Sequence, residues 1–100
     1  MSENQIADSA GSEAVRDIVV HNKLGFHARP AAMIAKTASR FDAEITIEKG
    51  GTTVSAKSLM GILSLEASKG SRIRIVGVGD DAEAAVAELE ELVKGGLEVD

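Results

Sequence analysis

A histidine and an arginine stand two residues apart in the segment Gly25-Phe26-His27-Ala28-Arg29-Pro30-Ala31-Ala32. Imidazole can act as a nucleophile that carries a group covalently, and a guanidinium group offers planar, permanently charged donors to phosphoryl oxygens. The first amide groups of a helix lack intrahelical partners, and the helix dipole adds a partial positive charge there. These residues favour a phosphate-handling site if a helix begins here, although a merely solvated or capping histidine fits them too.

A helix is predicted to begin at this segment. Between Ala28 and about Ser39 the apolar residues recur at positions i, i+3, i+4 and i+7, which places them on one helical face; they are Ala31, Ile34, Ala35 and Ala38. Pro30 suits the first turn of such a helix. The β-branched run 18–20 predicts a strand before it, and residues 22–25, with Asn and Gly, predict the loop that leads to His27.

The remaining residues predict three more strands and two more helices. Residues 44–48 and 52–56 are strands of a hairpin with a glycine turn at Gly50-Gly51, and residues 72–75 form a further strand. Ser58 caps a short helix over 59–65. In the last helix the buried stripe is formed by Ala82, Val86, Leu89 and Val93, Asp80 and Glu83 form a capping box, and Gly95-Gly96 ends it. Gly77-Val78-Gly79 is interpreted as a turn.

The element order βαββαβα predicts an α+β domain in which an antiparallel sheet carries its helices on one face. A generic split βαβ fold has the same order and remains open. One domain is expected over residues 15–96, with tails at 1–14 and 97–100. With 100 residues, 44% of them apolar, the chain can bury one core.

Composition narrows the classes of function. The net charge of −5 and the presence of only two aromatic residues, Phe26 and Phe41, argue against nucleic acid as a partner. Without cysteine there is no disulfide or thiolate metal site, and two histidines make a poor metal set. The first 13 residues resemble neither a signal peptide nor a membrane span. We therefore expect a cytoplasmic chain with protein partners, no metal and no cofactor.

Two further positions could contribute to function. Ser58 is placed to cap a helix and, if phosphorylated, to have its charge stabilised by the helix dipole. Met60 and Phe26 are expected to be exposed near His27 as a docking patch, unless they simply pack together. His21 has no comparable context and is interpreted as a surface residue. A serine–histidine hydrolase is disfavoured because there is no nucleophile elbow or orienting group.

The motifs together resemble the HPr phosphocarrier proteins of the bacterial phosphoenolpyruvate-dependent phosphotransferase system. The resemblance covers residues 15–94. Residues 25–31 are similar to the active-site signature of that family, and Lys57-Ser58-Leu59-Met60-Gly61 is similar to its regulatory serine segment. The interval between His27 and Ser58 fits as well.

This resemblance implies a fold and a function. The fold would be an open-faced β-sandwich, with four antiparallel strands covered by three helices. His27 would accept a phosphoryl group on Nδ1 from phosphorylated enzyme I and pass it to an enzyme IIA component, so the protein would be a carrier rather than an enzyme. Arg29 and the backbone at Ala28 would hold the phosphoryl oxygens. The carrier is expected to be a monomer.

The resemblance also implies regulation and a docking surface. Ser58 would be phosphorylated from ATP if an HPr kinase/phosphorylase is a partner. The partner-docking residues would be Phe26, Ala32, Met60 and Ile62. Residues 22–25 and 41–44 are also similar to the nitrogen-related branch, whose members serve regulatory phosphorelays, so the branch stays open. The alternative is a non-catalytic split βαβ module that binds a ligand or a protein.

Overall fold

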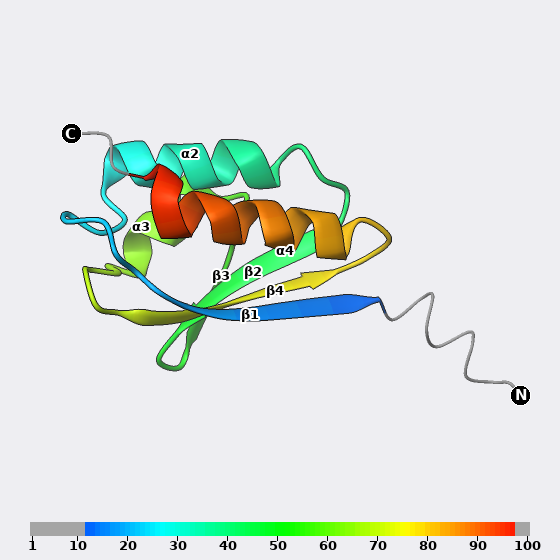
Figure 1. Ribbon diagram of the computed structural model, residues 1–100, viewed down its shortest axis with the longest axis horizontal. Coiled ribbons are helices and arrows are strands. Elements are labelled where there is room, and N and C mark those ends of the chain that lie inside the picture. The colour runs from blue at the N-terminus through cyan, green and yellow to red at the C-terminus, as the bar shows by residue number, and fades with distance from the viewer. Residues whose placement is uncertain (1–11, 98–100) are drawn as a thin grey trace, which may run out of the picture.

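Four strands form one antiparallel sheet in the computed structural model, which describes residues 12–97. The strands are β1 (Glu13–Val19), β2 (Glu44–Lys49), β3 (Thr52–Ser55) and β4 (Arg72–Val78), in the spatial order β1-β4-β2-β3. Helices α2 (Ala28–Ala38), α3 (Leu59–Ser64) and α4 (Ala82–Glu91) lie on one side of this sheet (Figure 1). A short π-helix, η1 (Leu92–Gly96), continues α4. The predicted α+β architecture and element order are confirmed.

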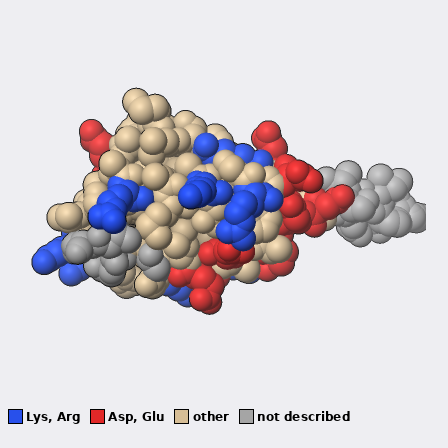
Figure 2. Space-filling view, turned by 90° about the horizontal axis from the view of Figure 1, so that it is seen from above, with Lys and Arg blue, Asp and Glu red and all other residues tan. Residues whose placement is uncertain are grey.

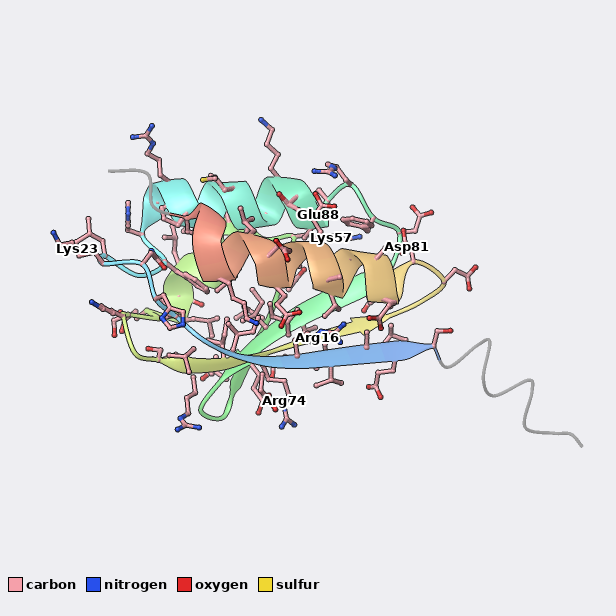
Figure 3. All side chains as sticks on the ribbon, in the orientation of Figure 1. Arg16, Lys23, Lys57, Arg74, Asp81 and Glu88 are labelled. Carbon is pink, nitrogen blue, oxygen red and sulfur yellow. The ribbon has the colours of Figure 1, made fainter. Side chains whose placement is uncertain are left out.

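Alternation along the strands separates the two faces of the sheet. Ile75 of β4 lies opposite Ile47 of β2, and both are buried under the helices. The next residue, Arg74, faces the other way and donates from Nε to Asp17 of β1 at 2.7 Å. Figure 3 shows Arg74 pointing away from the helices. A residue period of two thus buries one face and leaves the other to solvent.

The helices bury the residues that their spacing predicts. Ala31, Ile34 and Ala38 of α2 are buried, and so is the stripe of Ala82, Val86, Leu89 and Val93. Gly77 does not lie in the turn predicted for residues 77–79 but within β4. A Cβ atom at Gly77 would lie 2.8 Å from Cγ2 of Val86, so the missing side chain allows α4 to pack closely on the sheet.

Two boundaries of the domain differ from those expected. Strand β1 begins at Glu13, inside the predicted tail 1–14, because Ala14 faces the core and is buried. At the other end Leu97, assigned to the C-terminal tail, is also buried. Residues 1–11 and 98–100 of the two predicted tails lie outside the described residues.

The predicted capping box at the start of α4 is wrong. The N-cap is Asp81 rather than Asp80, and its carboxylate makes no bond within the helix. It accepts instead from the backbone amides of Asp42 at 2.9 Å and Ala43 at 2.8 Å. The hydrogen bond from the Asp42 amide is the main reason that the pKa of Asp81 lies below its usual value. Asp81 therefore ties the start of α4 to the segment that enters β2.

Candidate functional site

His27 is the N-cap residue of α2. Its backbone is extended, with φ −80° and ψ −171°, and its carbonyl accepts from the amide of Ala31 at 2.9 Å. The imidazole makes no capping hydrogen bond and is half-buried. A purely capping role for this side chain is therefore excluded, and the imidazole is left at the positive end of the helix dipole.

The first turn of α2 presents small and cationic residues beside His27. Ala28 and Arg29 are both exposed, and the first turn contains no acidic residue. Pro30, the third residue of the helix, is buried and turns towards the core. The side of the turn next to the imidazole is thus open to an approaching group and carries positive charge.

The loop in front of His27 is held by three hydrogen bonds that sequence reasoning did not identify. The amide of Gly25 donates to the carbonyl of Asn22 at 3.1 Å, and Nδ2 of Asn22 donates back to the carbonyl of Gly25 at 2.5 Å. The amide of Phe26 donates to the carbonyl of Ala67 at 2.9 Å. An Asn followed three residues later by Gly is a turn signal that could have indicated the first two bonds.

Ser58 caps α3 as predicted. Its Oγ accepts from the amide of Gly61 at 2.9 Å, and its carbonyl accepts from the amide of Ile62 at 2.9 Å. Helix α3 packs against α2, the helix whose N-cap is His27. The serine is half-buried, and its hydroxyl oxygen accepts the capping bond at the helix start.

Only part of the predicted docking set is on the surface. Met60 is 73% exposed, and Ala32 is exposed as well. Phe26 is only 3% exposed and Ile62 is fully buried, so the expectation that these two form a docking surface is wrong. The Phe26 side chain belongs to the hydrophobic core, and Ile62 lies on the inner face of α3.

Leu24 and Leu59 are exposed hydrophobic residues that the sequence did not single out. Leu24, in the loop before His27, is 61% exposed, and Leu59, the first residue of α3, is 40% exposed. Together with Met60 they form what we call the exposed apolar set. Their side chains offer apolar contact area that another protein could cover.

The charged residues are unevenly distributed. Figure 2 shows Lys and Arg side chains lying across the helical face, whereas Asp and Glu side chains gather at the end where β1 begins. Along α2, Arg29 and Lys36 are exposed and lie seven residues apart. Arg40, just after the helix, is also exposed but is paired with Glu88 at 2.9 Å. That spacing puts Arg29 and Lys36 on one side of the helix, and these cations of α2 would complement an acidic partner surface.

Other classes of site are not developed in residues 12–97. No group of three or more His, Asp or Glu side chains there is arranged as metal ligands would be. No described helix is long and apolar enough to cross a bilayer. His21 is exposed, as predicted for a surface residue.

Comparison with known proteins identifies the family. The family model described as "PTS HPr component phosphorylation site" matches residues 14–95. The phosphocarrier protein NPr of Shewanella violacea is 49% identical over 71 residues, which are 71% of this chain and 78% of that protein. The phosphocarrier protein HPr of Treponema pallidum is 40% identical over 84% of this chain and 96% of its own length.

A solved structure supports the same assignment. The crystal structure of HPr from Bacillus anthracis superposes with a TM-score of 0.79 at 46% identity, covering 82% of this chain and 98% of the other. The open-faced sandwich expected for the family is therefore the fold of this chain. A match of this extent in both sequence and fold shows that the chain belongs to the HPr phosphocarrier family of the phosphotransferase system.

Proposed function

We propose that this protein carries a phosphoryl group on His27, taking it from phosphorylated enzyme I and giving it to an enzyme IIA component. The observation that carries the proposal is the position of His27 at the N-cap of α2 with its imidazole not used for capping. This histidine lies within the region that matches a family model described as a phosphorylation site. The first turn of α2 is exposed beside the imidazole, which suits a protein that carries a phosphoryl group between partners better than an enzyme that encloses a substrate.

The transfer needs a nucleophilic nitrogen and a place for the phosphoryl charge. The lone pair of Nδ1 would attack phosphorus as the bond between phosphorus and the donor breaks, and the second transfer would release the group to the next acceptor in the same way. The dipole of α2 and the guanidinium of Arg29 would share the negative charge of the bound group. Each such contribution is modest at an exposed site, about 0.3–1 kcal/mol for the dipole.

Modest stabilisation suits a carrier. A group that must leave again cannot be held in a deep well, because ground-state binding adds to the barrier of the next step. The half-buried imidazole, the exposed first turn and the exposed apolar set would let two partners use one surface in turn. The remaining members of the predicted docking set, Ala32 and Met60, belong to this proposed surface.

We further propose that Ser58 is a regulatory phosphorylation site for an HPr kinase/phosphorylase that uses ATP. The support is its place at the start of a helix that packs against α2. A phosphate there would add close to two negative charges and would repel an acidic partner. A Ser58→Asp variant should therefore accept the phosphoryl group on His27 more slowly, whereas Ser58→Ala should not.

The downstream branch is a separate question with its own test. Both NPr and HPr proteins are relatives of this chain. The phosphorylated carrier should be offered to a sugar-specific enzyme IIA and to a nitrogen-related one at equal concentration. The faster transfer identifies the branch.

We propose that the carrier works in the cytoplasm as a monomer, since its docking surface serves one partner at a time. Light scattering coupled to size-exclusion chromatography measures the mass directly. A dimer at working concentration would contradict this part of the proposal.

The first experiment is a phosphorylation assay read by intact mass. The protein is mixed with enzyme I, Mg²⁺ and phosphoenolpyruvate beside the variants His27→Ala and His21→Ala. One acid-labile phosphoryl group is expected on the wild type and on His21→Ala, whose imidazole is exposed outside the site, and none on His27→Ala. A phosphoryl group that survives in His27→Ala, or a folded wild type that an active enzyme I leaves unmodified, would refute the proposal.

A second variant tests the cation. Arg29→Gln keeps a polar side chain of similar reach but removes the charge. We expect slower phosphorylation of His27, by on the order of tenfold if the guanidinium supplies about 1.4 kcal/mol to the transition state. Phosphorylation at the wild-type rate would remove Arg29 from the proposed mechanism.

A further inference from the structure

Asn22 is a buried polar residue next to the proposed site that the mechanism described so far does not use. Its side chain is almost completely enclosed, with 4% of the residue exposed, and Nδ2 donates to the carbonyl of Gly25. Among the described residues its Oδ1 is a buried oxygen that has no hydrogen-bond donor. A buried amide kept with one unsatisfied atom needs an explanation.

The single bond made by this amide fixes a particular peptide group. The carbonyl of Gly25 and the amide of Phe26 belong to the same planar peptide unit. Asn22 binds the carbonyl at 2.5 Å, and the carbonyl of Ala67 binds the amide at 2.9 Å. The unit is thus held on both sides, one residue before His27.

The rest of the turn leaves this unit little freedom. Gly25 has φ +68°, and a Cβ atom built on it would lie 2.3 Å from the carbonyl oxygen of Ala67. The amide of Gly25 also returns to the carbonyl of Asn22. Phe26 is anchored in the core, so any rotation of the unit is passed to the backbone of His27.

We propose that Asn22 is a positioning residue for phosphoryl transfer, which sets the orientation of His27 by clamping the Gly25–Phe26 peptide unit. This inference rests on the proposed carrier function. The amide does not touch the reacting atoms. It acts through the backbone, and the choice of Asn follows from the need for a donor at Nδ2 in a space too enclosed for water to replace it.

Asn22→Asp is the sharpest perturbation, since it keeps the shape and replaces the donor with an oxygen that faces the carbonyl oxygen of Gly25. Misplacement of a reacting group by about 1 Å can slow a reaction by on the order of a hundredfold. We expect the kcat for phosphorylation by enzyme I to fall at least tenfold. The KM should change less than twofold, because the exposed apolar set and the cations of α2 are untouched.

The matched control is Asp81→Asn. Asp81 also clamps backbone groups, the amides of Asp42 and Ala43, but at the opposite end of the molecule from the loop that contains Lys23 (Figure 3). This variant should lose stability while keeping the kcat of the wild type. Asn22→Ala removes the donor without adding a charge. A loss of kcat in this variant as well would show that the loss in Asn22→Asp does not come from the new carboxylate alone.

A spectrum separates this inference from the carrier function. In the unphosphorylated protein, the amide resonances of Phe26 and His27 should shift in Asn22→Asp and Asn22→Ala and stay in place in Asp81→Asn. Wild-type kcat in both Asn22 variants, or equal losses of kcat in Asp81→Asn, would overturn the positioning role. Failure of the wild type to accept phosphate would instead refute the proposed function, and the spectra would still report on the clamp.

Discussion

Replacement of Gly25 by alanine tests how tightly the loop before His27 is built. The residue has φ +68°, where an L-residue with a side chain is disfavoured by about 1–2 kcal/mol. Its new Cβ would meet the carbonyl oxygen of Ala67 at 2.3 Å, which no side chain tolerates. The backbone must therefore move and lose the bond from the amide of Phe26, which adds about 1–3 kcal/mol. Together these effects predict a loss of roughly 2–5 kcal/mol in the free energy of unfolding.

Gly50→Ala is the matched control. Gly50 has φ +60°, almost the same backbone conformation, but nothing lies within 4 Å of a Cβ built on it. Only the conformational effect of about 1–2 kcal/mol should appear. The difference between the two variants then measures the contact of Gly25 with the segment at Ala67, separately from the strain that both share.

Urea unfolding followed by far-ultraviolet circular dichroism provides the free energies, because the chain contains no Trp or Tyr for fluorescence. Thermal unfolding provides a second measure, since about 1 kcal/mol lowers Tm by roughly 4–8 °C in a domain of this size. Equal losses of stability in Gly25→Ala and Gly50→Ala would refute the argument. They would mean that the close approach to Ala67 relaxes without cost and does not hold the loop.

Three further predictions concern the surface, the cap and acid stability. Met60 is exposed, so Met60→Ala should leave the unfolding free energy within about 0.5 kcal/mol of the wild type and raise the KM for enzyme I. Ile62 is buried, so Ile62→Ala should lower the unfolding free energy by about 2–5 kcal/mol. Urea unfolding measures the two free energies, and the phosphorylation assay measures the KM. Ser58→Ala should lose about 1 kcal/mol of stability through the missing cap on the amide of Gly61, and Ser58→Asp should lose less, as urea unfolding of the two variants would show. The pKa of Asp81 is lowered in the folded protein. Its stabilising effect is therefore present above about pH 4, the pKa of an unfolded aspartate, and is lost as the pH falls through the folded pKa. When urea unfolding is repeated over that acid range, the Asp81→Asn variant should lose less stability with falling pH than the wild type.

The elements that sequence reasoning predicted are those whose pattern is local. The spacing of Ile34 and Ala38 defines a helical face within eleven residues, and the glycine pair at 50–51 defines a hairpin within one turn. Ser58 satisfies a cap three residues away. For such features the chain near the residue contains all the information, so the family motifs and the local physics led to the same prediction.

The features that were mispredicted depend on contacts distant in the sequence. The docking role expected for Ile62 came from the family resemblance and not from a pattern in the chain, and the residue is enclosed on the inner face of α3. Phe26 packs in the core and its amide bonds to Ala67, 41 residues later. The Asp81 carboxylate accepts from the amides of residues 42 and 43. No pattern within a short window contains these partners.

The division between open and fixed groups at the site suits what a phosphocarrier has to do. Two partners must reach one imidazole, which requires exposure, yet transfer also requires that the nitrogen lie in line with the incoming phosphorus. In this chain the exposure lies in front, at Ala28 and Arg29, and the constraint lies behind, in the bonds that join Asn22 and Ala67 to the peptide before His27. Because these bonds hold the backbone and not the imidazole, the ring nitrogens are not used for capping and would be available to a phosphoryl group under the proposed function.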